Sequence, residues 1–299
     1  MYNVKGKLSL SMKFTKPINE LVKQRFSCRT YSNQLISDQI KQDLIEFMSS
    51  NKIGPFGNTA RFELAAAVEG DDQALKNLGT YGFIKGATGY IIGAVKPGKK
   101  NLEDFGFLLE AIVLHATDLG LGTCWLGGSF TKSSFARRIS AQQNEIVPAV
   151  ISTGYIADKP RLVERMIRRG AKAKRRLGWE CLFYNGDFNK TLNEQEAGDF
   201  RLALEMVRLA PSASNRQPWR VVKKDNNWHF FLQRNKGYNK RRSVKLFSNA
   251  DLQRIDMGIA MCHFELMARD LGLLGSWSAE DPGIEKPDKL TEFISSWEG

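Results

Sequence analysis

The sequence predicts an α+β protein in which two related halves form one intrachain pseudo-dimer, and three observations support this class. An apolar helix followed by Gly-Leu and then Trp occurs twice, with a period of about 155 residues. Strand-like runs precede each copy, as expected where helices and sheets share a core. The 299 residues are 42% apolar and 25% charged, which is typical of a globular chain with a well-buried core.

The repeat is clearest between Gly106–Trp125 and Gly258–Trp277, which align over 20 residues without a gap. Each copy is typical of a helix that ends at a glycine, because glycine suits the left-handed C-cap position. Helices that are apolar on most sides belong in a core, so we expect both to be buried between the halves. Eight positions are identical, where composition predicts about one by chance: Gly106/Gly258, Leu114/Leu266, Ala116/Ala268, Asp118/Asp270, Leu119/Leu271, Gly120/Gly272, Leu121/Leu273 and Trp125/Trp277.

The repeat extends upstream of these helices. Ile53–Asn58 looks like a shortened copy of Leu209–Asn215, and each precedes a strand-like run. Helix-like segments come before both, at Ser37–Asn51 and Asn193–Leu209. Two halves of this size are expected to pack face to face, like a two-fold dimer whose subunits have been joined.

We therefore expect one unit over residues 1–299, made of halves at about 14–160 and 178–299 that the basic connection 161–177 joins. Each half should hold a mixed, mostly antiparallel sheet. The Asn226-Asn227 pair is typical of a hairpin turn. The candidate strands are Arg61–Val68, Gly89–Val95, Val147–Gly154, Trp219–Lys223 and Trp228–Gln233.

The net charge of +12 is concentrated in two segments, Arg161–Arg176 and Arg234–Lys245, so the rest of the chain is near neutral. A protein that coats nucleic acid would spread its charge more widely. Two local patches suit a small phosphate-bearing ligand or an anionic substrate, and a solvated surface explains them equally simply. We favour no nucleic-acid partner, although a basic nucleic-acid-binding scaffold remains a rival interpretation.

The cysteines and histidines indicate neither a disulfide framework nor a metal site. The four cysteines lie far apart and form no C-x-x-C pair, so we expect a reducing cytoplasmic location and no metal. His115 and His263 fall on the apolar helices, where a core histidine is the simpler interpretation. No apolar run approaches the ~20 residues that cross a bilayer, so we expect no membrane partner.

The segment Ala210–Trp219 reads Ala-Pro-Ser-Ala-Ser-Asn-Arg-Gln-Pro-Trp and joins a helix-like run to a strand-like run. Small hydroxyl and amide residues at such a turn leave backbone N–H groups able to bind an anion or a flavin edge. On local chemistry alone, an ordinary loop is an equally good interpretation.

Four segments together resemble the FMN-dependent nitroreductase family: Arg25–Tyr31, Leu119–Gly128, Lys174–Leu177 and Ala210–Trp219. The resemblance spans Pro17 to Trp277 and implies a nitroreductase-like α/β/α sandwich. Family dimers divide these motifs between two subunits around each flavin. Here the Ala-Pro-Ser motif follows the basic stretch, which resembles the branch of TM nitroreductases that carries both halves on one chain.

The resemblance implies one FMN per chain, between the halves. Arg25, Ser27 and Arg176, with Lys174, would bind the phosphate, because guanidinium groups suit phosphate oxygens. The other implied cofactor-binding residues are Arg29 and Lys85 at the pyrimidine edge of the ring, Leu126, Gly127 and Gly128 near N5, and Pro211, Ser212, Ala213, Ser214 and Asn215 on the opposite wall. The matching motifs in the other half have decayed, so the protein should be a monomer with a single flavin.

The implied activity is that of an NAD(P)H oxidoreductase that reduces nitroaromatics, quinones or similar small electron acceptors by hydride transfer through flavin N5. We expect no catalytic side chain, because the flavin carries the chemistry. The alternative is a carrier or redox sensor that binds FMN without turnover. The same motif places Cys28 among arginines, where a small spacer is a simpler role than a reactive thiol.

Overall fold

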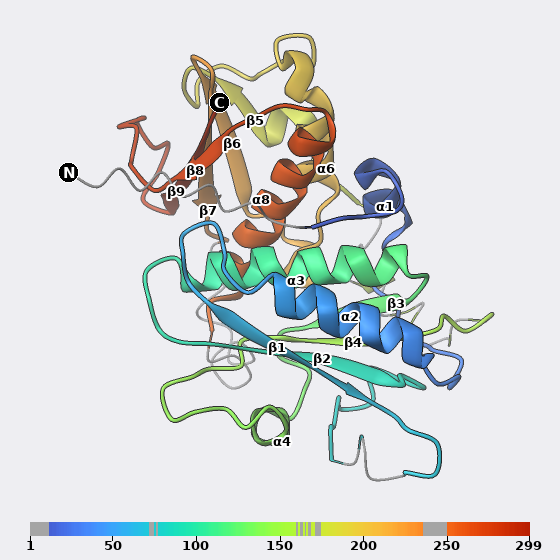
Figure 1. The fold of residues 1–299 in the computed structure, drawn as a ribbon. Helices are drawn as coiled ribbons and strands as arrows, with labels where there is room; N and C mark the ends of the chain where they lie inside the picture. Colours follow the sequence, from blue (N-terminus) through green and yellow to red (C-terminus); the bar gives the residue numbers. More distant parts are fainter. Residues whose placement is uncertain are drawn as a thin grey trace.

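Two β-sheets lie on either side of a pair of long helices that pack against each other (Figure 1). The structure is a computed structural model, and it describes residues 12–71, 75, 77–159, 161, 164, 166, 169–170, 175–235 and 250–299. Both long helices are buried along almost their whole length. The prediction of two central buried helices is therefore confirmed.

The N-terminal sheet has the strand order β1-β2-β4-β3, and all its pairs are antiparallel. One face packs on the central core, and the other packs on α4 through Phe135. The strand β2 is buried throughout because both faces are covered. The elements in chain order are α1 (Ile18–Gln24), α2 (Asp38–Ser50), β1 (Ala60–Ala66), β2 (Gly89–Val95), α3 (Asn101–Asp118), β3 (Gly122–Leu126), α4 (Lys132–Arg138) and β4 (Val150–Gly154).

The C-terminal sheet has the order β5-β6-β7-β9-β8, and β5 pairs with β6 in parallel. Apart from β5, its strands follow the same order in sequence as those of the N-terminal sheet: first, second, fourth, third. In each sheet, the long helix precedes the edge strand at the end of that order. The elements are η1 (Trp179–Cys181), β5 (Phe183–Asn185), η2 (Gly198–Phe200), α6 (Arg201–Leu209), η3 (Ala213–Asn215), β6 (Trp219–Lys224), β7 (Asn227–Gln233), α8 (Leu252–Asp270), β8 (Ser276–Ser278) and β9 (Thr291–Glu298).

The two long helices touch through their repeated glycines. A Cβ on Gly106 would collide with the backbone oxygen of Ile255, and a Cβ on Gly258 would collide with that of Glu103. Only glycine lets the two backbones approach this closely. The repeated glycines therefore set the distance between α3 and α8.

Both long helices end in the same way. Gly120 has φ of +82° and Gly272 has φ of +75°, and the amides of the following leucines bond back to Ala116 (2.9 Å) and Ala268 (2.8 Å). This is the bonding pattern of a Schellman C-cap. The glycine C-caps expected from the repeat are confirmed.

Three sequence expectations about the elements are wrong in detail. The hairpin turn falls at Asp225-Asn226, one residue earlier than expected, because Asp225 takes φ of +54° and Asn227 pairs with Lys224. The helix expected from Asn193 begins with η2, because Gly198 at φ of +57° interrupts the helical path. The N-terminal sheet is antiparallel throughout rather than mixed. Within the described ranges, no helix has the length and apolarity needed to cross a bilayer.

Alanine at Gly258 should lower the free energy of unfolding by about 1–3 kcal/mol, because the collision with the α3 backbone outweighs alanine's better helix propensity of about 1 kcal/mol. Urea unfolding followed by circular dichroism measures this. Gly170→Ala is the matched control, since no atom of the described residues lies within 4 Å of its added Cβ. Equal stability of the two variants would contradict the packing role.

Candidate functional site

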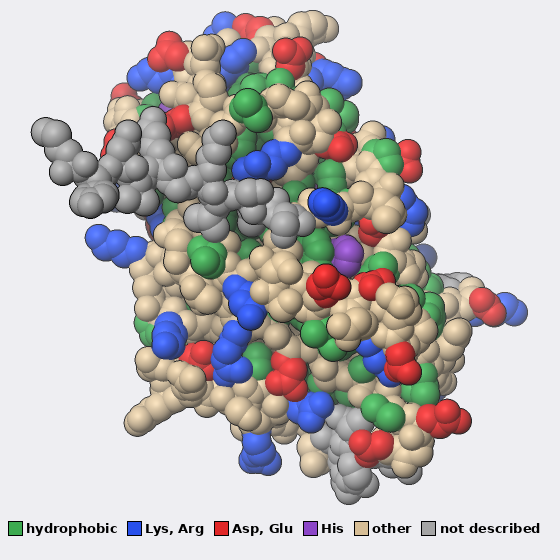
Figure 2. Space-filling view, in the orientation of Figure 1, with side chains coloured by type: hydrophobic (Ala, Val, Ile, Leu, Met, Phe, Trp, Pro, Cys, Tyr) green, Lys and Arg blue, Asp and Glu red, His purple; other side chains and the backbone are tan. Residues whose placement is uncertain are grey.

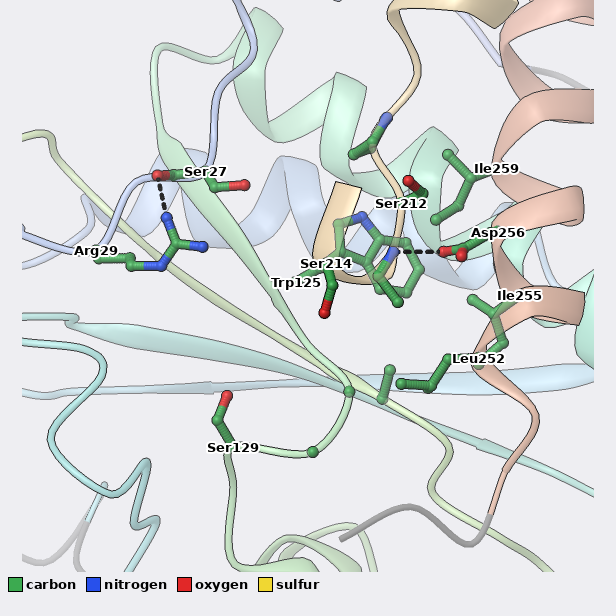
Figure 3. A pocket seen from close by; sticks show the side chains of 15 residues that line it. Ser27, Arg29, Trp125, Ser129, Ser212, Ser214, Leu252, Ile255, Asp256 and Ile259 are labelled. Atoms are coloured by element: carbon green, nitrogen blue, oxygen red, sulfur yellow. Dashed lines mark hydrogen bonds between the residues drawn. The ribbon is translucent and has the colours of Figure 1, made fainter. Parts of the chain in front are cut away.

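A cavity of about 250 Å³ lies where the two parts of the chain meet (Figure 3). Its lining combines apolar side chains with hydroxyl, guanidinium and carboxyl groups, as in sites that bind small molecules. The lining residues are Ser27, Arg29, Trp125, Gly127, Gly128, Ser129, Ala149, Pro211, Ser212, Ala213, Ser214, Leu252, Ile255, Asp256 and Ile259.

The wall from the N-terminal part is an extended segment that runs beside β3. The Cys28 amide donates to the carbonyl of Thr123 at 2.8 Å, which fixes Ser27 and Arg29 at the cavity. Arg29 donates from Nη1 to the carbonyl of Ser27 at 3.2 Å. The guanidinium group is thereby held against the cavity by its own backbone.

Directly after β3, Gly127 and Gly128 form the floor. A Cβ on Gly127 would lie 2.8 Å from the Leu252 side chain at the start of α8. A side chain here would force the two walls apart. The glycine therefore lets the end of β3 and the start of α8 border one cavity.

The opposite wall is the loop Pro211–Ser214, which left-handed residues shape. Ser214 and Asn215 both have φ of +53°, and Gln217 has φ of +50°. The Ser212 Oγ accepts from the Gln217 amide at 2.8 Å, and Gln217 Oε1 accepts from the Leu177 amide at 2.9 Å. Gln217 therefore holds the loop and does not line the cavity.

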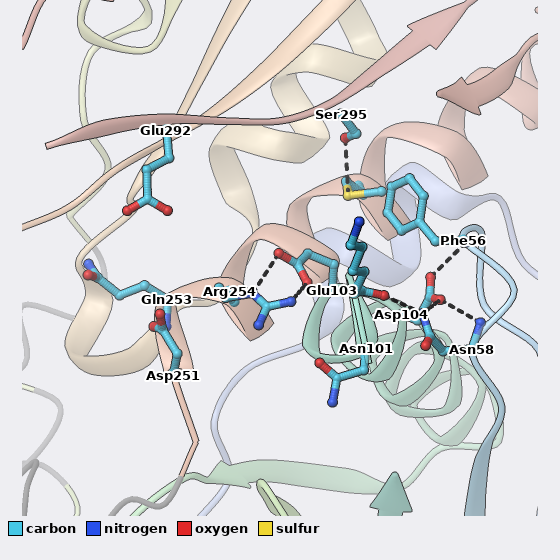
Figure 4. A network of polar contacts seen from close by, with 12 residues as sticks. Phe56, Asn58, Asn101, Glu103, Asp104, Asp251, Gln253, Arg254, Glu292 and Ser295 are labelled. Atoms are coloured by element: carbon cyan, nitrogen blue, oxygen red, sulfur yellow. Dashed lines mark hydrogen bonds and ion pairs between the residues drawn. The ribbon is translucent and has the colours of Figure 1, made fainter. Parts of the chain in front are cut away.

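A buried aspartate fastens each of the two repeated loops. Asp256 on α8 accepts from the Ala213 amide at 2.9 Å. Asp104 occupies the same position relative to its helix glycine, and it accepts from the amides of Phe56 and Asn58, each at 2.9 Å (Figure 4). Both loops are thus tied to the long helix of their own part of the chain.

Two predicted phosphate ligands lie close to each other at the edge of the loop. Burial lowers the pKa of Arg176, and the charges of Arg25 and Arg208 lower it further. Arg176 donates to the carbonyl of Leu209 at 3.1 Å and to Asn215 Oδ1 at 3.3 Å. Two guanidinium groups that repel each other favour a bound anion, because a negative charge beside both groups reduces the repulsion.

Below the cavity, the buried carboxylate of Glu110 joins several elements. It accepts from the indole N–H of Trp125 at 2.7 Å, lies 3.7 Å from Arg25 and lies 2.9 Å from His263 Nε2. His263 Nδ1 lies 2.9 Å from the carbonyl of Met206, which can only accept. The imidazole therefore donates from Nδ1 to that carbonyl, and its Nε2 faces the Glu110 carboxylate. This network positions the Trp125 wall.

Cys28 lies between Ser27 and Arg29, where the sequence allows either a small spacer or a reactive thiol. Burial raises its pKa to about 12, and its Sγ donates to the Thr30 carbonyl at 3.3 Å. A thiol with such a pKa carries almost no thiolate near neutral pH. The finding favours the spacer role.

Eight of the fourteen predicted cofactor-binding residues line the cavity: Ser27, Arg29, Gly127, Gly128, Pro211, Ser212, Ala213 and Ser214. Arg25, Arg176 and Asn215 are not among the lining residues, although Arg25 lies 3.7 Å from Glu110 and Arg176 bonds to Asn215. Lys174 falls outside the described residues. Leu126 and Lys85 are not among the lining residues. Leu126 is buried against Phe130 and its neighbours, and Lys85 bridges through its backbone to Thr30.

Sequence reasoning missed the α8 contribution of Leu252, Ile255, Asp256 and Ile259. These residues recur at the spacing of one helix face, and Asp-x-Gly stands at the same place in both copies of the repeat. That spacing was a usable signal. Trp125 lies in the repeat and in the Leu119–Gly128 motif but was not assigned to the site, and Ser129 and Ala149 carry no sequence signal that we recognise.

The chain belongs to the nitroreductase family described as "Putative TM nitroreductase", whose model matches residues 17–268. The resemblance stated from the motifs is thereby confirmed. No curated protein matches the chain.

The fold is similar to that of a "putative nitroreductase" from Thermotoga maritima, with a TM-score of 0.58, 19% identity, and coverage of 94% of this chain and 93% of that one. This likeness establishes a nitroreductase-like fold of mixed helices and sheets. An FMN-dependent nitroreductase from Clostridium difficile matches 47% of this chain and 88% of its own, at 20% identity and a TM-score of 0.37.

Replacing Glu110 with alanine should lower the free energy of unfolding by about 3–5 kcal/mol, because His263, Arg25 and the Trp125 N–H lose a buried partner. Chemical unfolding of the purified variant measures the loss. Glu194→Ala is the control, since Glu194 and Arg201 are 55% and 53% exposed and such pairs contribute about 0–1 kcal/mol. A loss no larger than the control's would refute the network's role.

Ellman's reagent should react with one thiol per native chain and with four after denaturation. Cys181 is exposed, whereas Cys28, Cys124 and Cys262 are buried and burial raises the pKa of each. Cys181→Ser should abolish the native reaction. Rapid modification of Cys28 would show instead that a reactive thiolate borders the cavity.

Proposed function

We propose that the protein is an FMN-dependent NAD(P)H oxidoreductase of nitroreductase type, with FMN bound in the cavity between the two parts of the chain. The observation that carries the proposal is the cavity itself. Segments far apart in sequence, Ser27–Arg29, Gly127–Ser129 and Pro211–Ser214, converge on one space. Three of the four family motifs thus border the same ligand-sized site.

The residues present fit an anionic, planar cofactor. The charges of Arg25 and Arg176 act on each other, and Glu110, which lies 3.7 Å from Arg25, also contacts His263. Trp125, Ile255 and Ile259 offer apolar surface for a ring. Bound FMN would supply hydride transfer through its N5 between NAD(P)H and a nitroaromatic, quinone or similar acceptor.

Each wall has its own role in this proposal. Arg25, Ser27 and Arg176 would hold the phosphate through charge-assisted hydrogen bonds. Arg29 would place a positive charge beside the ring, and this charge would stabilise the anionic reduced form of the flavin. Gly127 and Gly128 would let backbone N–H groups approach the ring closely, and Pro211–Ser214 would exclude water from its other side.

We further propose that the chain is a fused pseudo-dimer in which one of two former sites survives. The place equivalent to the cavity wall, beside Asp104, holds an ion pair between Arg254 and Glu103 at 2.5 Å (Figure 4). Lys100 stands where Leu252 stands at the cavity, and burial lowers the pKa of Lys100. Charged side chains thus occupy the space that apolar residues leave open in the cavity.

With FMN well above its dissociation constant, the purified monomer should bind one FMN per chain, because both walls belong to one chain. Absorption near about 450 nm, with released FMN counted per chain, measures the ratio, and anaerobic NADH or NADPH should bleach the band. A ratio near two, or FMN binding that is lost on dilution to monomer, would contradict the single-site proposal. Bound FMN that neither nucleotide bleaches would indicate a carrier or redox sensor.

Alanine at Arg25 should weaken FMN binding by about 10- to 100-fold, because one charge-assisted contact is lost. Fluorescence titration measures the dissociation constant, and thermal unfolding of the apoprotein separates binding from stability. Lys23→Ala is the control, since Lys23 is an exposed cation on α1. Unchanged FMN affinity in Arg25→Ala would remove Arg25 from the phosphate site.

A further inference from the structure

Asp256 lines the cavity, and one of its carboxyl oxygens has no hydrogen-bond partner among the described residues. Its side chain lines the cavity and the residue is only 3% exposed. Oδ1 accepts from the Ala213 amide at 2.9 Å, whereas Oδ2 has no hydrogen-bond partner among the described residues. Buried polar atoms in folded proteins are nearly always paired, so the lone oxygen requires an explanation.

An aspartate can fasten such a loop without leaving an oxygen unpaired, as the equivalent aspartate in the other part of the chain shows. Asp104 uses both oxygens: Oδ1 accepts from the Phe56 amide, and Oδ2 accepts from the amide and the side chain of Asn58. Asp104 does not line the cavity. The lone oxygen therefore belongs to the aspartate that faces the cavity.

The position of Asp256 complements that of Arg29. Figure 3 shows the two side chains on opposite sides of the cavity, with the Trp125 indole, Ile255 and Ile259 on the Asp256 side. A planar ring in this space would meet a guanidinium group at one edge and a carboxyl group at the other.

The polarity of the carboxyl group follows from its surroundings. Burial raises the pKa of Asp256 well above its ordinary value, and the nearby Asp251 charge adds to this, while the Ala213 hydrogen bond lowers it. This shift favours the protonated, neutral form of the carboxyl group. In that form Oδ1 accepts from the Ala213 amide, so the proton lies on Oδ2, which can then donate.

We propose that Asp256 contacts the bound ligand, and that its Oδ2 hydroxyl donates a hydrogen bond to an acceptor atom, a carbonyl oxygen or an imine nitrogen, on a planar ring in the cavity. This inference rests on the proposed function. The acceptor atom belongs either to the FMN ring or to the molecule that FMN reduces. In both cases Asp256 selects rings that carry an acceptor at the edge away from Arg29.

Three variants test the contact. Asp256→Asn keeps an oxygen for Ala213 and an N–H donor for the ligand, so its FMN dissociation constant should stay within about twofold of wild type. Asp256→Ala loses the donor and should bind the molecule that carries the acceptor atom, FMN or the electron acceptor, about three- to tenfold more weakly. Asp104→Ala is the matched control, because it loses an equivalent loop contact away from the cavity. It should lower stability but leave FMN affinity unchanged.

Two readouts separate the sources of the acceptor atom. If that atom lies on FMN, Asp256→Ala weakens FMN binding and displaces the visible absorption maximum of the bound flavin. If that atom lies on the electron acceptor, Asp256→Ala leaves the FMN dissociation constant unchanged but raises the KM for a quinone or nitroaromatic. In Asp256→Asn this KM should return to the wild-type value. Either result supports the contact.

Three results would overturn the proposed contact. In the first, Asp256→Ala leaves FMN affinity, the flavin spectrum and KM unchanged. In the second, Asp256→Ala weakens FMN binding without changing the flavin spectrum, which is the result expected if Asp256 only fastens the loop. Asp256→Asn could also be as impaired as Asp256→Ala, which would exclude a neutral donor. If the wild-type chain binds no FMN, the proposed function itself fails, and that outcome is distinct from FMN binding that ignores Asp256.

Discussion

The close packing of α3 against α8 is the constraint on which the other features depend. Gly106 and Gly258 each face a backbone carbonyl of the opposite helix, so the two helices meet backbone to backbone. This contact fixes the distance between the two sheets. It also fixes the distance between the end of β3 and the start of α8, and those two segments border the cavity.

Polar groups buried at this interface link the fold to the candidate site. Glu110 on α3 bonds to His263 on α8 and to the indole of Trp125, so one carboxylate joins the central helices to the cavity wall. Asp256 joins α8 to the opposite wall through Ala213. Groups buried this deeply hold their partners firmly, because an unpaired alternative costs several kcal/mol. The walls are therefore fixed by the same helices that form the core.

Local pattern sufficed for much of the fold and for most of the site. The repeat predicted both long helices and their glycine C-caps, and the candidate strand Gly89–Val95 matches β2 at its observed bounds. Family motifs located eight residues that line the cavity. The hairpin turn and the start of α6 were misplaced, because single left-handed residues, Asp225 and Gly198, decided them and several nearby residues could have taken that conformation.

The sequence by itself determined the class of the protein, the two central helices and the segments from which a ligand site could be built. Only the tertiary structure decided which of those segments meet. Lys85 and Leu126 were assigned to the site but do not line the cavity, whereas Asp256 and Ile259 line it without belonging to any of the four family motifs. The physical reason is that a cavity is formed by surfaces that pack across the chain. The register of α8 against α3 sets those surfaces, and no single segment encodes that register.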